Sequence, residues 1–243
     1  MRIQETTVTI TYNRVDNIKR SYLQYKDLLK HFNEATMLPI PDDAPLEIPR
    51  IIIKSLNEHA QLNISPIATT LAVKYDNGFE NNWQMCSGYL NERIVSIFDL
   101  LDRITNQNYK YIGLVSTILF DDVTKNGAQV ITRNLLNTEK IKDLYDVNIK
   151  YTFAEDENTF VNIMLQNARI YNSTATGEHS GELSPENQVY ESIGAIIDIN
   201  DRKGYNENKQ YKSDRNKLQG LIDYMDEIVT FKLELLLKKG EYR

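Results

Sequence analysis

The sequence predicts an α+β protein in which antiparallel β-meanders are packed by amphipathic helices. Residues 3–12 alternate apolar and polar side chains, which is typical of a half-buried strand. Residues 89–104 place their apolar side chains at helical spacing. Between them, residues 50–75 hold three short β-prone runs separated by polar breaks, which favours strands joined by tight turns.

In the first half, a helix is expected from about residue 16 to residue 32, where apolar side chains recur every three or four positions. Residues 38–49 contain four prolines and are expected to be an extended connector. The meander follows, with strands at 50–54, 61–65 and 69–75. The helix at 89–104 then covers the sheet.

In the second half, residues 109–120 form a nearly continuous β-branched and aromatic run, which predicts a central strand buried on both faces. A short helix is expected at 135–145, and β-rich segments at 148–153, 160–171 and 190–200. The polar stretch 172–187 is expected to be a mobile loop. A long helix is predicted to begin near Ser213 or Asp214 and to end at Gly240.

We expect one α+β domain over residues 1–243. Strands followed by a packing helix occur twice, so the domain could consist of two related halves, 1–122 and 146–243, joined by 123–145. No repeat is visible residue by residue, so the duplication rests on the order of elements alone.

Composition excludes several classes of protein. No apolar run is long enough to span a membrane, and the N-terminus lacks the pattern of a secretory signal, so we expect a cytoplasmic protein with no membrane partner. The phosphate-binding motifs GxGxxG and GxxxxGK[ST] are absent, and we expect no cofactor. The single cysteine, Cys86, lies with Trp83 where a helix is expected to begin, and both are interpreted as packing residues.

Two sets of residues could act on nucleic acid. A metal-dependent nuclease needs an aspartate and a Glu-x-Lys pair on neighbouring strands, and Asp198, Glu207 and Lys209 are the best candidates for those catalytic positions. A basic stretch interleaved with tyrosines could grip phosphates and stack bases. It comprises Arg202, Lys203, Tyr205, Lys209, Tyr211, Lys212 and Arg215. The net charge of -6 favours the alternative, a solvated loop.

Other polar residues give weaker signals. His59 could serve as a general base, but its neighbour Glu58 would point to the opposite face of a strand, so a solvated turn histidine is favoured. His179 lies in a polar loop with carboxylates, and Asp121 with Asp122 follows a strand where Mg²⁺ could bind. For His179 the favoured interpretation is a polar loop without a metal, for Asp121 and Asp122 it is a pair that merely ends the strand, and no metal site is predicted.

Four segments together resemble a sporadically distributed, uncharacterised family of prokaryotic α+β proteins of about this length. They are APLEIPR (44–50), GYLNERIVSIFDLL (88–101), YIGLVSTILF (111–120) and IGAIIDIN (193–200), followed by a long final helix. The resemblance covers most of the chain and transfers no functional residue. It implies a bacterial or phage-related mobile locus of the defence or toxin–antitoxin kind.

We therefore expect a non-enzymatic binding or assembly protein that has a protein partner or forms a homo-oligomer. The alternative is a metal-dependent nucleic-acid-binding protein or nuclease, with nucleic acid as the less favoured partner. Catalytic residues that lie far apart in a sequence leave no local motif, so the absence of such motifs is weak support for the first expectation.

Overall fold

The structure, a computed structural model, describes the chain except for residues 42, 77, 121–125, 137–143, 172–187 and 243. Its frame is one antiparallel sheet of nine strands in the order β2-β3-β4-β5-β1-β6-β9-β8-β7. The strands are β1 Arg2–Tyr12, β2 Thr36–Met37, β3 Ile51–Lys54, β4 Ala60–Ile64, β5 Ala68–Lys74, β6 Tyr109–Phe120, β7 Asn148–Ala154, β8 Phe160–Tyr171 and β9 Gln188–Asn200. Antiparallel meanders with packed helices confirm the predicted fold class.

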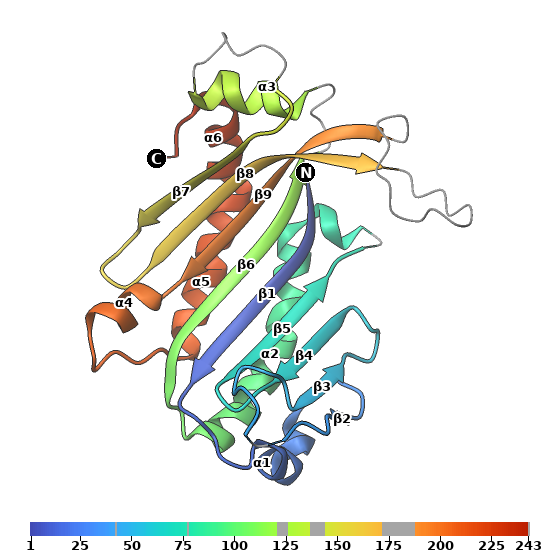
Figure 1. Cartoon of the computed structure of the whole chain (residues 1–243), viewed down its shortest axis with the longest axis vertical. Coiled ribbons are helices and arrows are strands. Elements are labelled where there is room, and N and C mark those ends of the chain that lie inside the picture. Colours follow the sequence, from blue (N-terminus) through green and yellow to red (C-terminus); the bar gives the residue numbers. More distant parts are fainter. Residues whose placement is uncertain (42, 77, 121–125, 137–143, 172–187, 243) are drawn as a thin grey trace.

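The two halves of the sheet have the same topology. In each half a long strand, β1 or β6, lies at the centre, and a three-stranded meander, β3-β4-β5 or β7-β8-β9, runs back toward it from the edge. The two central strands pair along their length, so Val8 faces Leu114. Figure 1 shows the two sets of strands side by side, with β1 and β6 adjacent in the middle of the sheet. In this arrangement β6 is the first strand of the second set, as β1 is of the first.

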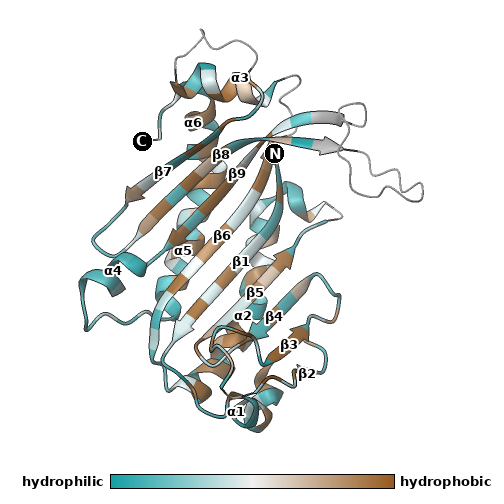
Figure 2. Ribbon diagram, viewed as in Figure 1, coloured by the Kyte–Doolittle hydropathy of each residue, from teal (hydrophilic) through white to brown (hydrophobic). Residues whose placement is uncertain are grey.

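The helices lie on one face of the sheet, except α4, whose Tyr205 contacts Tyr111 at the end of the other face. They are α1 Ile18–Tyr25, α2 Trp83–Thr105, α3 Gly127–Ile131, α4 Arg202–Glu207, α5 Arg215–Glu227 and α6 Leu233–Lys239, with π-helical turns at Thr132–Leu136 and Ile228–Lys232. Figure 1 shows α2 and α5 behind the strands, each under one half of the sheet. On inner strands such as β1, β5 and β6, alternate side chains are buried, and Figure 2 shows a matching alternation of colour along the strands. On the edge strand β7 no side chain is fully buried.

The helical run from α5 to α6 has the two ends that its sequence predicts, whereas α2 begins earlier than predicted. The Asp214 side chain accepts a hydrogen bond from the Lys217 backbone N–H and caps α5. Gly240 adopts φ +70° and ends α6, because a residue without Cβ enters the left-handed region at little cost. Trp83 and Cys86 are buried in the first turn of α2, as predicted, although α2 begins six residues before the predicted start at Tyr89.

Three predictions on local structure are wrong. Strand β6 is buried on one face only, because Thr117, Val115 and Gly113 alternate with the core side chains and stay partly exposed. The first helix ends at Tyr25 and continues as a short 3-10 turn, so Phe32 packs against the core from a loop. The polar stretch after β9 contains helix α4.

Several predictions fall largely or wholly outside the described residues. The predicted helix at 135–145 lies largely outside the described residues, which show helical structure from 127 to 136. The polar loop 172–187, with His179, and the pair Asp121 and Asp122 also lie outside them. Within the described part of the chain, no helix is both long and apolar enough to cross a membrane.

Candidate functional site: the uncovered face of the sheet

One face of the sheet carries no helical layer among the described elements, and we call it the open face. Figure 1 is viewed onto this face, with α2 and α5 behind it. Directly paired residues of antiparallel strands share a face, so the register defines its members. We follow it over the five strands from β5 to β8. Its members are Ala68, Thr70, Ala72 and Lys74 on β5; Glu5, Thr7, Thr9 and Thr11 on β1; Tyr111, Gly113, Val115 and Thr117 on β6; Ile196, Asp198 and Asn200 on β9; and Phe160, Asn162 and Met164 on β8.

The middle of the open face is built from small, uncharged side chains. One row across the sheet runs through Ala72, Thr7 and Val115, and the next runs through Thr70, Thr9 and Gly113. Most of these side chains are partly exposed, since β-branched neighbours shield one another. The hydroxyl groups of Thr9 and Thr70 lie 3.4 Å apart. Such a surface is flat and offers hydroxyl groups and methyl groups side by side.

Charged residues lie around this centre. Glu5 is opposite Lys74 in the register of β1 and β5, at one end of the face, and its carboxylate accepts a hydrogen bond from the Thr7 hydroxyl at 3.4 Å. Asp198 accepts hydrogen bonds from the side-chain amides of Asn162, at 3.2 Å, and Asn200, at 2.9 Å. A carboxylate that receives two donors from its own sheet is held in place by the fold.

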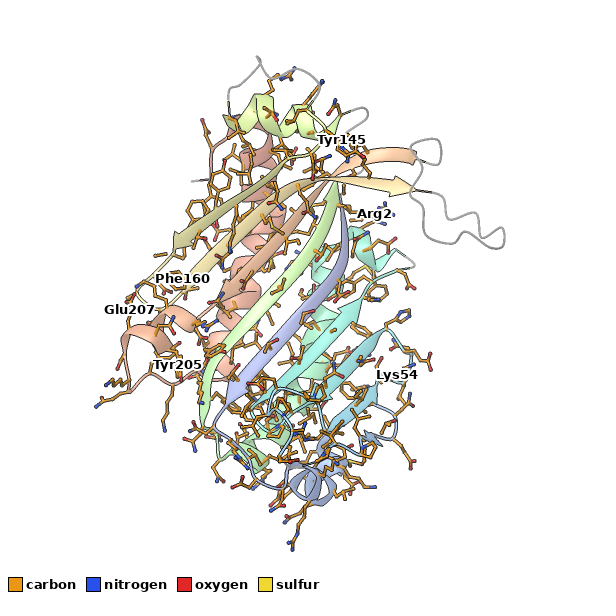
Figure 3. All side chains as sticks on the ribbon, viewed as in Figure 1. Arg2, Lys54, Tyr145, Phe160, Tyr205 and Glu207 are labelled. Carbon is orange, nitrogen blue, oxygen red and sulfur yellow. The ribbon has the colours of Figure 1, made fainter. Side chains whose placement is uncertain are left out.

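The structure separates the three residues predicted for a nuclease. Asp198 lies on β9, within the open face, whereas Glu207 ends helix α4 and forms an ion pair of 3.1 Å with Lys203. Lys209 follows that helix and lies on no strand. Figure 3 shows Glu207 and Tyr205 together at the α4 end of the molecule, far from Lys54. Among the described residues, no three His, Cys, Asp or Glu side chains gather as a metal would require.

The predicted basic stretch is largely engaged with the protein itself. Arg215 pairs with Asp99 at 2.8 Å and with Asp102 at 3.5 Å. Lys212 donates to the side-chain oxygen of Asn108 at 3.1 Å. Lys203, besides its ion pair, donates to the backbone carbonyl of residue 157. These contacts reduce the positive potential that a nucleic acid would meet.

Two residues of that stretch do border the open face. The Tyr205 ring lies 5.3 Å from the ring of Tyr111, and the guanidinium of Arg202 lies 5.5 Å from the same ring. Helix α4 therefore forms a rim at one end of the open face. The remaining tyrosine of the stretch, Tyr211, donates instead to the buried carboxylate of Asp201 at 2.7 Å.

Asp201 holds the chain around this rim in place, and no local sequence motif indicated this role. Its side chain is fully buried and accepts hydrogen bonds from the Ile112 backbone N–H at 2.6 Å, from Tyr211 and from the Ser213 hydroxyl. It thus ties β6, the end of β9 and the start of α5 together. Burial and the hydrogen bond to Asp201 raise the pKa of Tyr211 above its usual range.

His59 lies away from the open-face centre, on the rim of a pocket of about 120 Å³. Its Nδ1 is 3.7 Å from a carboxylate oxygen of Asp76, a partner that sequence spacing could not indicate. The rings of Tyr75, Phe79 and Tyr89 line the pocket together with Asn57 and Lys74. Sites for cofactors or substrates are usually several times larger, from about 300 Å³ upward.

Cys86 is not a reactive thiol. Its side chain is buried, and burial raises the pKa of the thiol to about 12. The thiolate, which is the nucleophilic form, is therefore scarce at neutral pH.

No protein-family model matches this chain, and no curated protein matches it at a significant level. The resemblance drawn from the four sequence segments therefore stays a prediction.

The open face has two central rows that carry no charged residue on β5, β1 and β6, with Asp198 continuing one of these rows on β9, and it has the α4 rim at one end. Its side chains can donate and accept hydrogen bonds and can pack against methyl groups.

Proposed function

We propose that this chain is a non-enzymatic binding protein that holds a protein partner against the open face of its sheet. The observation that carries the proposal is a nine-stranded sheet whose described helices cover one face and leave the centre of the other uncharged. The sheet and its helices already form two packed layers, and an antiparallel sheet of this kind can leave its other face accessible. A partner that supplies the third layer would complete this arrangement.

The charges favour a protein over a nucleic acid. The chain carries a net charge of -6, and the two central rows of the open face hold no lysine or arginine on β5, β1 and β6. Nucleic-acid affinity depends on basic side chains that neutralise phosphates. Protein interfaces, in contrast, have centres depleted in charge and rims that are polar.

The chemistry of the face also indicates the kind of protein surface that would fit. Thr7, Thr9 and Thr117 present methyl and hydroxyl groups at nearly one level, beside the aliphatic side chains of Val115 and Ile196. A flat surface of small groups matches helices that carry small or aliphatic residues, because such helices can approach a sheet closely. We therefore infer a partner with an uncharged, amphipathic helical surface.

The cellular setting remains part of the proposal. A cytoplasmic protein of a bacterial or phage-related defence or toxin–antitoxin system, acting with the product of a neighbouring gene, is the setting that the sequence resemblance implies. An acidic chain without a metal cluster in its described part is consistent with a binding role in such a system.

Native mass spectrometry of the protein expressed from its own operon tests the proposal, because it measures mass, stoichiometry and retained ligands together. We expect a defined complex with a protein encoded beside it. The variant Thr9→Lys, which places a charge at the centre of the open face, should abolish that complex. Thr230→Lys is the matched control, since Thr230 is exposed on the helical side, where its hydroxyl contacts Asp226.

Three results would contradict the proposal. The first is a complex that survives Thr9→Lys, and the second is a chain that retains no protein partner. The third is salt-sensitive binding of an oligonucleotide, or cleavage supported by Mg²⁺ or Mn²⁺, that is lost in the variant Asp198→Ala. That outcome would favour the alternative, a nucleic-acid-binding protein or nuclease.

A further inference from the structure

The two edges of the sheet are built differently. At one edge β2 has two residues, and the chain that follows it carries prolines, which cannot donate to a neighbouring strand. At the other edge β7 has seven residues and pairs with β8 without a bulge. On its outer side no described strand pairs with β7.

An edge of this kind is a template for another strand. Each unpaired edge presents a row of backbone N–H and C=O groups, and proteins usually protect such edges with prolines, bulges, several charges or a covering segment. Strand β7 contains no proline, and Lys150 is its single charged residue. Figure 1 shows β7 as the outermost strand of its half of the sheet.

We propose that β7 pairs antiparallel with β7 of a second copy, around a two-fold axis that passes through Tyr151. Identical surfaces that meet on a two-fold axis form a closed dimer. The two sheets would then join into one. This dimer uses the sheet edge and leaves the open face accessible, so either proposal can fail without the other.

The sequence of β7 is complementary to itself in this register. All seven residues find a partner, with Asn148 opposite Ala154 and Ile149 opposite Phe153. Lys150 faces Thr152 of the second copy, so no like charges meet. A shift by two residues toward the start of the strand would instead place Lys150 opposite Lys150, which is unfavourable.

The side of β7 that faces the helices also favours a second copy. Ile149, Tyr151 and Phe153 are half-buried on that side. The Phe153 ring stacks on Tyr242 at 4.4 Å and on Tyr151 at 6.2 Å. In the dimer this row of aromatic and aliphatic side chains meets its own copy, so apolar surface that is partly exposed in the monomer becomes covered.

Size-exclusion chromatography with light scattering, over a micromolar concentration series, tests the dimer. Thr152→Lys places two symmetry-related lysine pairs across the axis and should raise the dimer dissociation constant about tenfold. The double variant Lys150→Glu with Thr152→Lys turns each repulsive pair into an attractive one and should restore the dimer. Thr36→Lys, an exposed change on β2 at the opposite edge, should leave it unchanged.

A cross-link locates the contact. When the single variants Lys150→Cys and Thr152→Cys are mixed and oxidised, a disulfide should join the two different chains, and the buried Cys86 should contribute no background. A monomeric wild type at all concentrations would overturn the proposal. A dimer that Thr152→Lys does not weaken, or that forms no such cross-link, would overturn the assignment to β7.

Discussion

Removal of the Asp201 carboxylate should destabilise the protein more than any change of a surface charge. In Asp201→Ala, two buried donors, the Ile112 N–H and the Ser213 hydroxyl, lose their acceptor, and the partly buried Tyr211 hydroxyl loses its own. A buried donor without a partner costs ~1–3 kcal/mol. We therefore expect the free energy of unfolding to fall by about 4 kcal/mol, a large fraction of the ~5–15 kcal/mol that is typical of domains.

Urea unfolding followed by circular dichroism measures this change, with extrapolation to water. Asp99→Ala is the matched control, because Asp99 pairs with Arg215 at an exposed site, where side-chain exposures are 48% and 44%. Such a pair contributes ~0.2–1 kcal/mol. Asp201→Asn should lie between the two variants, since the amide keeps one acceptor oxygen. Equal decreases in the free energy of unfolding for Asp201→Ala and Asp99→Ala would show that the hydrogen bonds of Asp201 do not stabilise the fold as proposed.

Three further outcomes follow from the packing. Arg50→Ala should speed proteolysis within 41–48, because the buried Arg50 guanidinium donates to four backbone carbonyls of that loop. Gly220→Ala should stabilise the exposed middle of α5 by ~0.5–1 kcal/mol. Gly127→Ala should instead destabilise the protein, because its Cβ would lie 2.6 Å from a backbone carbonyl oxygen. Thermal unfolding of both variants measures the difference. Burial raises the pKa of Tyr12, so its contribution to stability is complete below the unfolded pKa of about 10 and is lost as the pH rises above it. Urea midpoints at pH 8 and 11 should show this loss, with a smaller pH dependence in Tyr12→Phe.

Local pattern determined the elements and their faces. Alternation along residues 3–12 predicted a half-buried strand, and its partly exposed threonines are the centre of the open face. The helix stripe at 89–104 predicted α2, and the N-cap and glycine signals placed the ends of the last helix. These signals are readable because periodicity and capping depend on residues within one or two turns of each other.

The tertiary structure decided which side of each strand is covered and which residues contact each buried polar group. The run at 109–120 is apolar enough to suggest burial on both sides, yet the structure covers one side and leaves the other open. Asp201 receives its hydrogen bonds from residues 10, 12 and 89 positions away. The predicted nuclease residues were separated because a short helix, α4, formed where a strand was required.

The physical reason is the range of the interactions. A side-chain period is set by the geometry of a single helix or strand, so one segment of sequence suffices to predict it. Strand order, the choice of covered face and the partners of a buried carboxylate depend on contacts between segments that are distant in the chain. The sequence by itself therefore predicted the order of strands and helices, whereas the tertiary structure decided which face of the sheet the helices cover and that β7 lies at its edge.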